Sequence, residues 1–163
     1  MTVPPDLPVL HLPALDLPEL DLAELNLAEL DLPSGSIRGV GIDLVQISRL
    51  EAALARQPSL QQRLFTTREY ESAHSLTAGQ VEPAAQLAMF FAAKESVMKA
   101  LGRGIDSMAF TEIQIGRAPD TPWGLTLSGR AALLAGQVGV QTWHLCMTHT
   151  PAMAQALVLG LAI

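Results

Sequence analysis

The chain has 163 residues, which suits one ordinary domain and is too short for two. Hydrophobic residues make up 49% of it, so a sizeable core can form. The formal charge of -6 is uneven, because seven of the sixteen acidic residues and none of the ten basic residues lie in residues 1–36. Residues 37–163 are therefore nearly neutral, and the acidic total says nothing about the ligands of that part.

Cysteine usage and hydropathy exclude several classes of protein. Cys146 is the single cysteine, so no disulfide can form within the chain. The start lacks the basic region of a signal peptide, and no apolar run approaches the roughly 20 residues that cross a membrane. The arginines lack interleaved aromatic residues, which disfavours nucleic-acid binding. We expect a soluble cytoplasmic protein without a membrane partner.

The first 36 residues form a leader that repeats every five residues from Leu7, as in LPALD, LPELD and LAELD. A five-residue period spreads the leucines around a helix and does not match the alternation of a strand, and the prolines would interrupt a helix. We therefore predict a disordered or loosely docked leader over 1–36, with a linker at its end, and a domain over 37–163. Three hypotheses for the leader stay open: a solubilising tail, an assembly repeat, and an acidic segment that competes with an acidic partner of the domain.

The domain begins with a predicted strand that is apolar and expected to be buried, and most of the elements that follow have clear boundaries. Pro58 closes the first helix, Thr66 and Glu69 form a capping box, and Pro83 suits the first turn of the longest helix, which Gly102 ends. Ser128 is the expected cap of the last helix. The predicted strands are 37–46, 110–117, 123–127, 140–148 and 153–163, and the predicted helices are 47–56, one that the capping box opens, 83–101 and 129–138.

This order of elements separates the helices from the strands, with a hairpin about Thr150 and Pro151 at the end. The predicted fold class is α+β, with an antiparallel sheet and a long helix packed on it. Cys146 is expected to be a packed thiol in an apolar strand. Met89, Met98 and Met108 are expected to fill the core.

Charged residues in two apolar segments are the candidates for chemistry. Asp43 lies inside the first strand, and Lys94, Glu95 and Lys99 lie on the long helix. A buried charge is costly unless it is paired or bound to a metal. One interpretation is an ion pair between Glu95 and Lys99, which share a helix face, together with a satisfied strand-end aspartate. The other is that Asp43 and Glu95 jointly hold Mg²⁺ while a lysine neutralises phosphate charge.

Five motifs together resemble those of the holo-acyl-carrier-protein synthases, the small single-domain phosphopantetheinyl transferases. In chain order they are GIDLVQISRL, LFTTREY, FFAAKESVMKALGRGI, TEIQI and MTHT. The resemblance covers about 120 residues, and the pair of GID with KExxxKAxGxGI is its most specific part. It implies a 4'-phosphopantetheinyl transferase-like fold and a role in fatty acid biosynthesis. The implied reaction is Mg²⁺-dependent transfer of 4'-phosphopantetheine from coenzyme A to a serine of an acyl carrier protein.

The resemblance also implies roles for individual residues and a homotrimer with active sites between subunits. Asp43 and Glu95 would hold Mg²⁺, and Glu95 and Lys99 would be catalytic, with Lys99 at the coenzyme A pyrophosphate. Gly102 and Gly104 would let the backbone approach coenzyme A, and His149 would lie against its nucleotide end. Lys94 matches a family lysine without a clear role. The base that takes the serine proton is left open between Glu95 and water.

Arginines in and after the first helix form a second candidate site. Arg49 and Arg56 are seven residues apart and share a helix face, and Arg63 and Arg68 follow. In the family that the chain resembles, the arginine matching Arg49 meets the acidic recognition helix of the carrier protein. Arg49 and Arg56 are therefore the expected partner-binding residues, although a merely solvated charged face is the alternative.

One position departs from the family pattern. Relatives usually carry an arginine four residues before Lys94, and this chain has Phe90 there. A cation lost near a polyanionic ligand would weaken binding or change the acceptor. The alternative function is therefore a module that binds coenzyme A or a carrier protein with weak or no catalysis.

Overall fold

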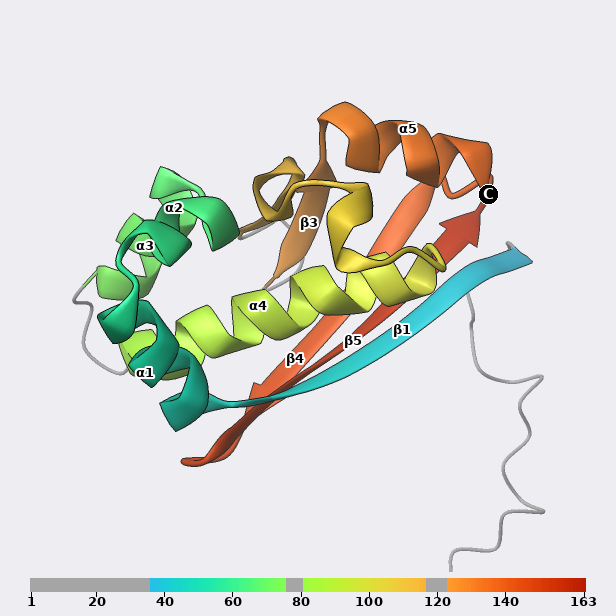
Figure 1. Ribbon diagram of the computed structural model, residues 1–163. Helices are drawn as coiled ribbons and strands as arrows, with labels where there is room; N and C mark the ends of the chain where they lie inside the picture. Colours follow the sequence, from blue (N-terminus) through green and yellow to red (C-terminus); the bar gives the residue numbers. More distant parts are fainter. Residues whose placement is uncertain (1–35, 76–80, 117–122) are drawn as a thin grey trace, which may run out of the picture. The chain divides into compact units, whose positions relative to one another are not determined.

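A long helix lying across a three-stranded antiparallel sheet organises the part of the chain that the structure describes (Figure 1). The computed structural model describes residues 36–75, 81–116 and 123–163, so the predicted leader lies outside the described residues except for Ser36. The helices are α1 (Ile47–Arg56), α2 (Ser59–Leu64), α3 (Thr67–His74), α4 (Pro83–Ala100) and α5 (Gly129–Gln137), with 3-10 turns η1 (Ile105–Ser107) and η2 (Phe110–Glu112). The strands are β1 (Ser36–Gln46), β2 (Ile113–Gly116), β3 (Gly124–Leu127), β4 (Thr142–His149) and β5 (Met153–Ala162). The predicted α+β class is confirmed.

The large sheet has the strand order β1-β5-β4, so the last strand lies between the other two. β1 pairs antiparallel with β5, which places Asp43 opposite Ala156. β4 and β5 form the predicted hairpin, whose turn closes with a hydrogen bond from the Thr150 backbone N–H to the Met153 carbonyl at 2.8 Å. β2 and β3 form a separate two-stranded antiparallel sheet, which the sequence did not distinguish from the first.

Two glycines of β1 let the backbone of α4 lie directly against the strand. A Cβ atom at Gly39 would overlap the Ala100 carbonyl, and one at Gly41 would overlap the Ser96 carbonyl. Residues 39, 41 and 43 point to the same side of β1, because side chains alternate along a strand. The close approach therefore brings Asp43 next to the last turns of α4.

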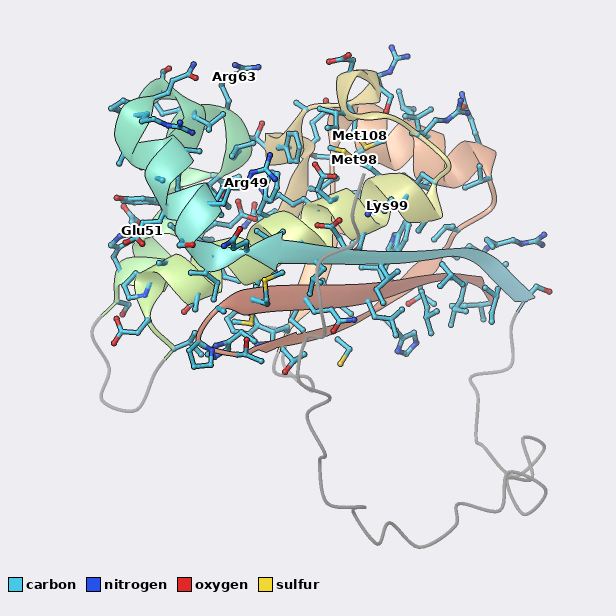
Figure 2. All side chains as sticks on the ribbon, turned by 60° about the horizontal axis from the view of Figure 1, so that its bottom comes forward. Arg49, Glu51, Arg63, Met98, Lys99 and Met108 are labelled. Carbon is cyan, nitrogen blue, oxygen red and sulfur yellow. The ribbon has the colours of Figure 1, made fainter. Side chains whose placement is uncertain are left out.

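The core forms around α4, which is buried on almost every side. Met89, Met98 and Met108 are 3%, 2% and 5% exposed, which confirms the prediction that these methionines fill the core. Figure 2 shows Met98 and Met108 on the same side of β1 as the helices, and both belong to the hydrophobic core. Ser96, also buried in α4, donates a hydrogen bond to the Ala156 carbonyl at 3.1 Å and so joins the helix to the central strand.

Three local predictions were wrong. No element was predicted at 59–64, where the structure forms the short helix α2 immediately after Pro58. Residues 110–112 form a 3-10 turn, and the strand begins only at Ile113. Ser128 makes no side-chain cap on α5; instead Glu112 accepts a hydrogen bond from the Arg130 backbone N–H at 3.1 Å.

One face of β1 is exposed in the single chain, although the sequence predicted a buried strand. Val40, Ile42 and Leu44 are between 53% and 60% exposed, while Gly41 and Val45 on the other face are buried. Cys146 of β4 is also exposed, so the prediction of a packed thiol is wrong for this chain. Among the described residues, no helix is long and apolar enough to cross a membrane.

Candidate functional site

A groove of about 720 Å³ lies between β1, α1, α2, α4 and the two 3-10 turns, and we call it the carboxylate groove. Two carboxylates and two guanidinium groups contribute to its wall, namely those of Asp43, Glu95, Arg49 and Arg63. Most of the other lining side chains are apolar, including Leu50, Leu64, Phe91, Ile105 and Phe110. Charged groups of both signs therefore face one partly apolar hollow.

Asp43 is held by a lysine from the neighbouring helix. The Lys99 Nζ atom lies 2.6 Å from Asp43 Oδ1 and also donates a hydrogen bond to the Ile42 carbonyl at 3.1 Å. The Asp43 side chain is 15% exposed and that of Lys99 is 50% exposed. The lysine thus contacts the strand and not Glu95, its expected partner one helical turn earlier.

Glu95 lies close enough to Asp43 for the two carboxylates to repel each other. Burial raises the pKa of the Glu95 carboxyl, the negative charge of Asp43 raises it further, and Lys99 partly opposes both effects. Two oxygen ligands of this kind, from β1 and α4 and facing one groove, fit the donor set that Mg²⁺ uses in phosphoryl-transfer sites. A divalent cation here would also relieve the repulsion that raises the Glu95 pKa.

A second ion pair lies beneath the groove, and sequence reasoning missed it. The Lys94 Nζ atom lies 2.7 Å from Glu69 Oε2, and both side chains are fully buried. The same ammonium donates to the Leu64 carbonyl at 2.8 Å and to the Phe110 carbonyl at 3.0 Å. All three of its donors are therefore used.

The Glu69 carboxylate is equally well satisfied. The predicted capping box is confirmed, with hydrogen bonds between the side chains and backbones of Thr66 and Glu69. Glu69 also accepts a hydrogen bond from the Ile115 backbone N–H at 2.7 Å, which ties α3 to β2. The sequence showed the cap but gave no signal for the partner of Glu69, which lies 25 residues further along the chain.

The buried pair holds the apolar wall of the groove in place. Burial lowers the pKa of the Lys94 ammonium, while the charge and hydrogen bond of Glu69 act in the opposite direction. The two carbonyls that it binds belong to Leu64 and Phe110, which both line the groove. Phe110 in turn stacks on Phe91 of α4, with ring centroids 5.4 Å apart. Lys94 is therefore a structural residue one position before Glu95.

Phe90, which departs from the family pattern, lies in the core. Its side chain is fully buried and meets the ring of Trp123 edge-on, with centroids 5.3 Å apart. An arginine at this position would place a guanidinium group among apolar side chains unless the surroundings rearranged.

The remaining predicted site residues lie at different distances from the groove. Arg49 lines it, and Figure 2 shows Arg49, Arg63 and Lys99 on the helix side of β1. Arg56, at the end of α1, is exposed and is not part of the groove lining. His149 ends β4, two strands from β1, and is exposed. The structure therefore brings Asp43, Glu95 and Lys99 together and leaves His149 apart.

The predicted glycine loop follows α4 directly. Gly102 has a φ of 63°, a conformation that side-chain-bearing residues rarely adopt, so a glycine is required for this turn. Apart from the glycine itself and its two chain neighbours, no residue has an atom within 4 Å of the position that a Cβ would occupy at Gly102 or Gly104. The loop therefore has open space on that side.

The fold and the groove define a small α+β protein with a candidate site for phosphate chemistry. Residues 39–157 match the family model of the 4'-phosphopantetheinyl transferase superfamily, and the chain belongs to that family. It is 39% identical over 125 residues to a holo-[acyl-carrier-protein] synthase of Streptomyces avermitilis, a match that covers 77% of this chain and 98% of the relative.

Solved structures of holo-acyl-carrier-protein synthases share the fold. The enzyme of Bacillus anthracis, solved in complex with coenzyme A (3',5'-ADP), matches with a TM-score of 0.61 and 26% identity, over 78% of this chain and 98% of that one. The Plasmodium yoelii enzyme with ADP bound matches with a TM-score of 0.70 over 80% of this chain and 98% of that one. Its identity of 22% supports the fold alone.

Proposed function

We propose that this protein transfers the 4'-phosphopantetheine group of coenzyme A to a serine of an apo acyl carrier protein and releases adenosine 3',5'-bisphosphate. The observation that carries the proposal is the convergence of Asp43, Glu95 and Lys99 beside one groove, in a chain of this family. The serine oxygen forms a bond to the phosphorus on the pantetheine side. The bond from that phosphorus to the bridging oxygen of the pyrophosphate breaks, and the serine proton goes to a base.

The charged residues of the groove have separate roles in this proposal. Asp43 and Glu95 would hold Mg²⁺, which supplies positive charge to the phosphate oxygens when bound. Lys99 would offset negative charge on the pyrophosphate, because its side chain is half-exposed and can reach a bound anion. The loop at Gly102 and Gly104 offers open space for coenzyme A.

The carrier protein would approach over α1. Arg49 and Arg56 are both exposed on this helix, and Arg49 also borders the groove. Exposed cations attract an acidic partner and orient it before contact, which raises the association rate more than the final affinity. The carrier's serine would then arrive beside the two carboxylates.

The proposed assembly is a homotrimer with sites between subunits. The exposed apolar residues Val40, Ile42 and Leu44 on the outer face of β1 support self-association, because monomeric proteins rarely leave such a row uncovered. In such an assembly, His149 would serve the groove of a neighbouring subunit. Light scattering should give three times the chain mass, and Ile42→Glu should reduce it to a single chain.

The test of activity is intact-mass spectrometry of an apo carrier protein after incubation with the protein, coenzyme A and Mg²⁺. We expect a mass increase equal to one phosphopantetheine. Asp43→Ala and Glu95→Ala should abolish the increase while the far-ultraviolet circular dichroism stays unchanged. Glu71→Ala is the matched control, because Glu71 is an exposed acid on α3 outside the groove. Near-normal turnover in either groove variant would refute the metal assignment.

The departure at Phe90 permits one alternative, a module that binds without turnover. Coenzyme A binding by calorimetry together with no mass increase on any carrier protein would support this alternative. The buried ring contact of Phe90 with Trp123 means that Phe90→Arg should lose stability before any gain in ligand affinity can be measured.

A further inference from the structure

The contact between Lys99 and Asp43 involves the carboxylate that the proposed function assigns to a metal ion. The Lys99 ammonium lies 2.6 Å from Asp43 Oδ1, a charge-assisted hydrogen bond of short length. A second bond, to the Ile42 carbonyl at 3.1 Å, fixes the ammonium on the strand side of α4. The lysine is therefore held against Asp43 by two acceptors of β1.

A metal ion and this ammonium compete for the same carboxylate. Mg²⁺ binds carboxylate oxygens directly, at about 2.0–2.1 Å, so a cation already in contact with that carboxylate adds like-charge repulsion. Using the other oxygen of Asp43 would not remove the repulsion, because both oxygens belong to one small group. A divalent cation would therefore bind more weakly while the Lys99 ammonium stays in contact with Asp43.

The exposure of Lys99 makes such a movement feasible. Half of its side chain is exposed, whereas the Lys94 side chain, five residues earlier on the same helix, is fully buried and uses all three donors on fixed acceptors. An exposed lysine changes rotamer within nanoseconds and loses little energy when it exchanges one anionic partner for another. A pyrophosphate bound beside α4 would supply the other partner.

We propose that Lys99 is a placeholder cation: it occupies Asp43 until an anionic substrate draws it away, and so couples metal binding to pyrophosphate binding. The proposal rests on the proposed function for its metal site and its substrate. It predicts that a divalent cation alone binds weakly, and that coenzyme A and the cation each strengthen the binding of the other by the same factor. The Lys99 ammonium would thus neutralise the charge of Asp43 when no substrate is bound.

The test measures Mn²⁺ binding to the full chain by electron paramagnetic resonance or calorimetry, first without any nucleotide. Removing the placeholder in Lys99→Met should tighten Mn²⁺ binding on the order of ten-fold. Lys99→Arg keeps the charge and should bind Mn²⁺ as weakly as the wild type. Arg103→Met is the matched control for net charge, because Arg103 is an exposed cation just after α4 that makes none of the side-chain contacts that Lys99 makes to β1.

A second arm adds coenzyme A and compares the gain in Mn²⁺ affinity between the wild type and Lys99→Met. The gain should be larger in the wild type, because only there does the substrate also remove a competing cation. The placeholder role alone would be overturned if the wild type and Lys99→Met bound Mn²⁺ equally well without coenzyme A. It would also be overturned if Arg103→Met tightened Mn²⁺ binding as much as Lys99→Met does. Absence of Mn²⁺ binding from both proteins, with and without coenzyme A, would overturn the metal site and with it that part of the proposed function.

Discussion

Replacing Lys94 by methionine should destabilise the protein far more than the same change at Lys99. The substitution leaves the buried carboxylate of Glu69 without its cation and the carbonyls of Leu64 and Phe110 without their donor. Removing one partner of a buried ion pair typically costs about 3–5 kcal/mol. That is at least a fifth of the total stability of an ordinary domain, which is about 5–15 kcal/mol.

The double variant Lys94→Met with Glu69→Gln separates the charge from the packing. It removes both charges, and the glutamine can still accept a hydrogen bond from the Ile115 backbone N–H. Its stability should therefore exceed that expected from the sum of the two single changes by about 2 kcal/mol. Lys99→Met, which breaks a half-exposed pair, should cost no more than about 1 kcal/mol.

Urea unfolding followed by circular dichroism measures these free energies. All variants should be compared at one protein concentration, because the proposed self-association would make the midpoint concentration-dependent. A loss below about 1 kcal/mol for Lys94→Met would refute the structural role of the pair. Strict additivity of the two single changes in the double variant would refute their coupling.

Three further predictions concern other parts of the molecule. Gly41→Ala should lower the free energy of unfolding by about 1–3 kcal/mol and also lower transfer activity. The new methyl group would meet the Ser96 carbonyl and push β1, with Asp43, away from α4. The control Gly136→Ala, which has open space beside it in α5, should leave stability in urea unchanged or raise it. The Arg130 backbone N–H holds the pKa of the Glu112 carboxyl below its usual range, slight burial opposes this, and the Ala109 N–H adds to it. Ionised Glu112 therefore stabilises the fold above the ordinary glutamate pKa and loses this effect as the pH falls through the lowered value. Glu112→Gln should lower the thermal midpoint at neutral pH, with a difference that narrows in acid; a difference that is constant with pH would contradict this. Deleting residues 1–35 should lower the Michaelis constant for carrier protein at low salt if the leader competes, and an unchanged constant would mean that the leader does not compete.

Local patterns in the sequence predicted the elements whose cause is local. The strand at 37–46, the helix at 47–56 and the capping box at Thr66 and Glu69 follow from periodicity and spacing within about ten residues, and the structure confirms them. Helix α4 was predicted from its alanines and from the proline and glycine at its ends, and it ends at Ala100, one residue before the predicted boundary.

Partners that lie far apart in the sequence were not predictable from such patterns. Spacing on α4 suggested Glu95 as the partner of Lys99, but the fold offers Asp43 and the Ile42 carbonyl instead, more than fifty residues away. In the same way, Ser128 had the expected residue type for a helix cap, yet Glu112 reaches the first turn of α5 from another element. Tertiary neighbours therefore decided the partner of Lys99 and the cap of α5, although the sequence offered a nearby residue for each.

The strand order has a kinetic consequence for the carboxylate groove. Asp43 is held in place by pairing with β5, at Ala156, so forming this pair closes a loop on the order of a hundred residues. The hairpin of β4 and β5 closes a turn of a few residues and can form much earlier. We therefore expect α4 and the hairpin to assemble first and β1 to dock late. Glu95 and Lys99 would then be in place before Asp43 joins them, and chemistry at this groove would begin only with that final docking step.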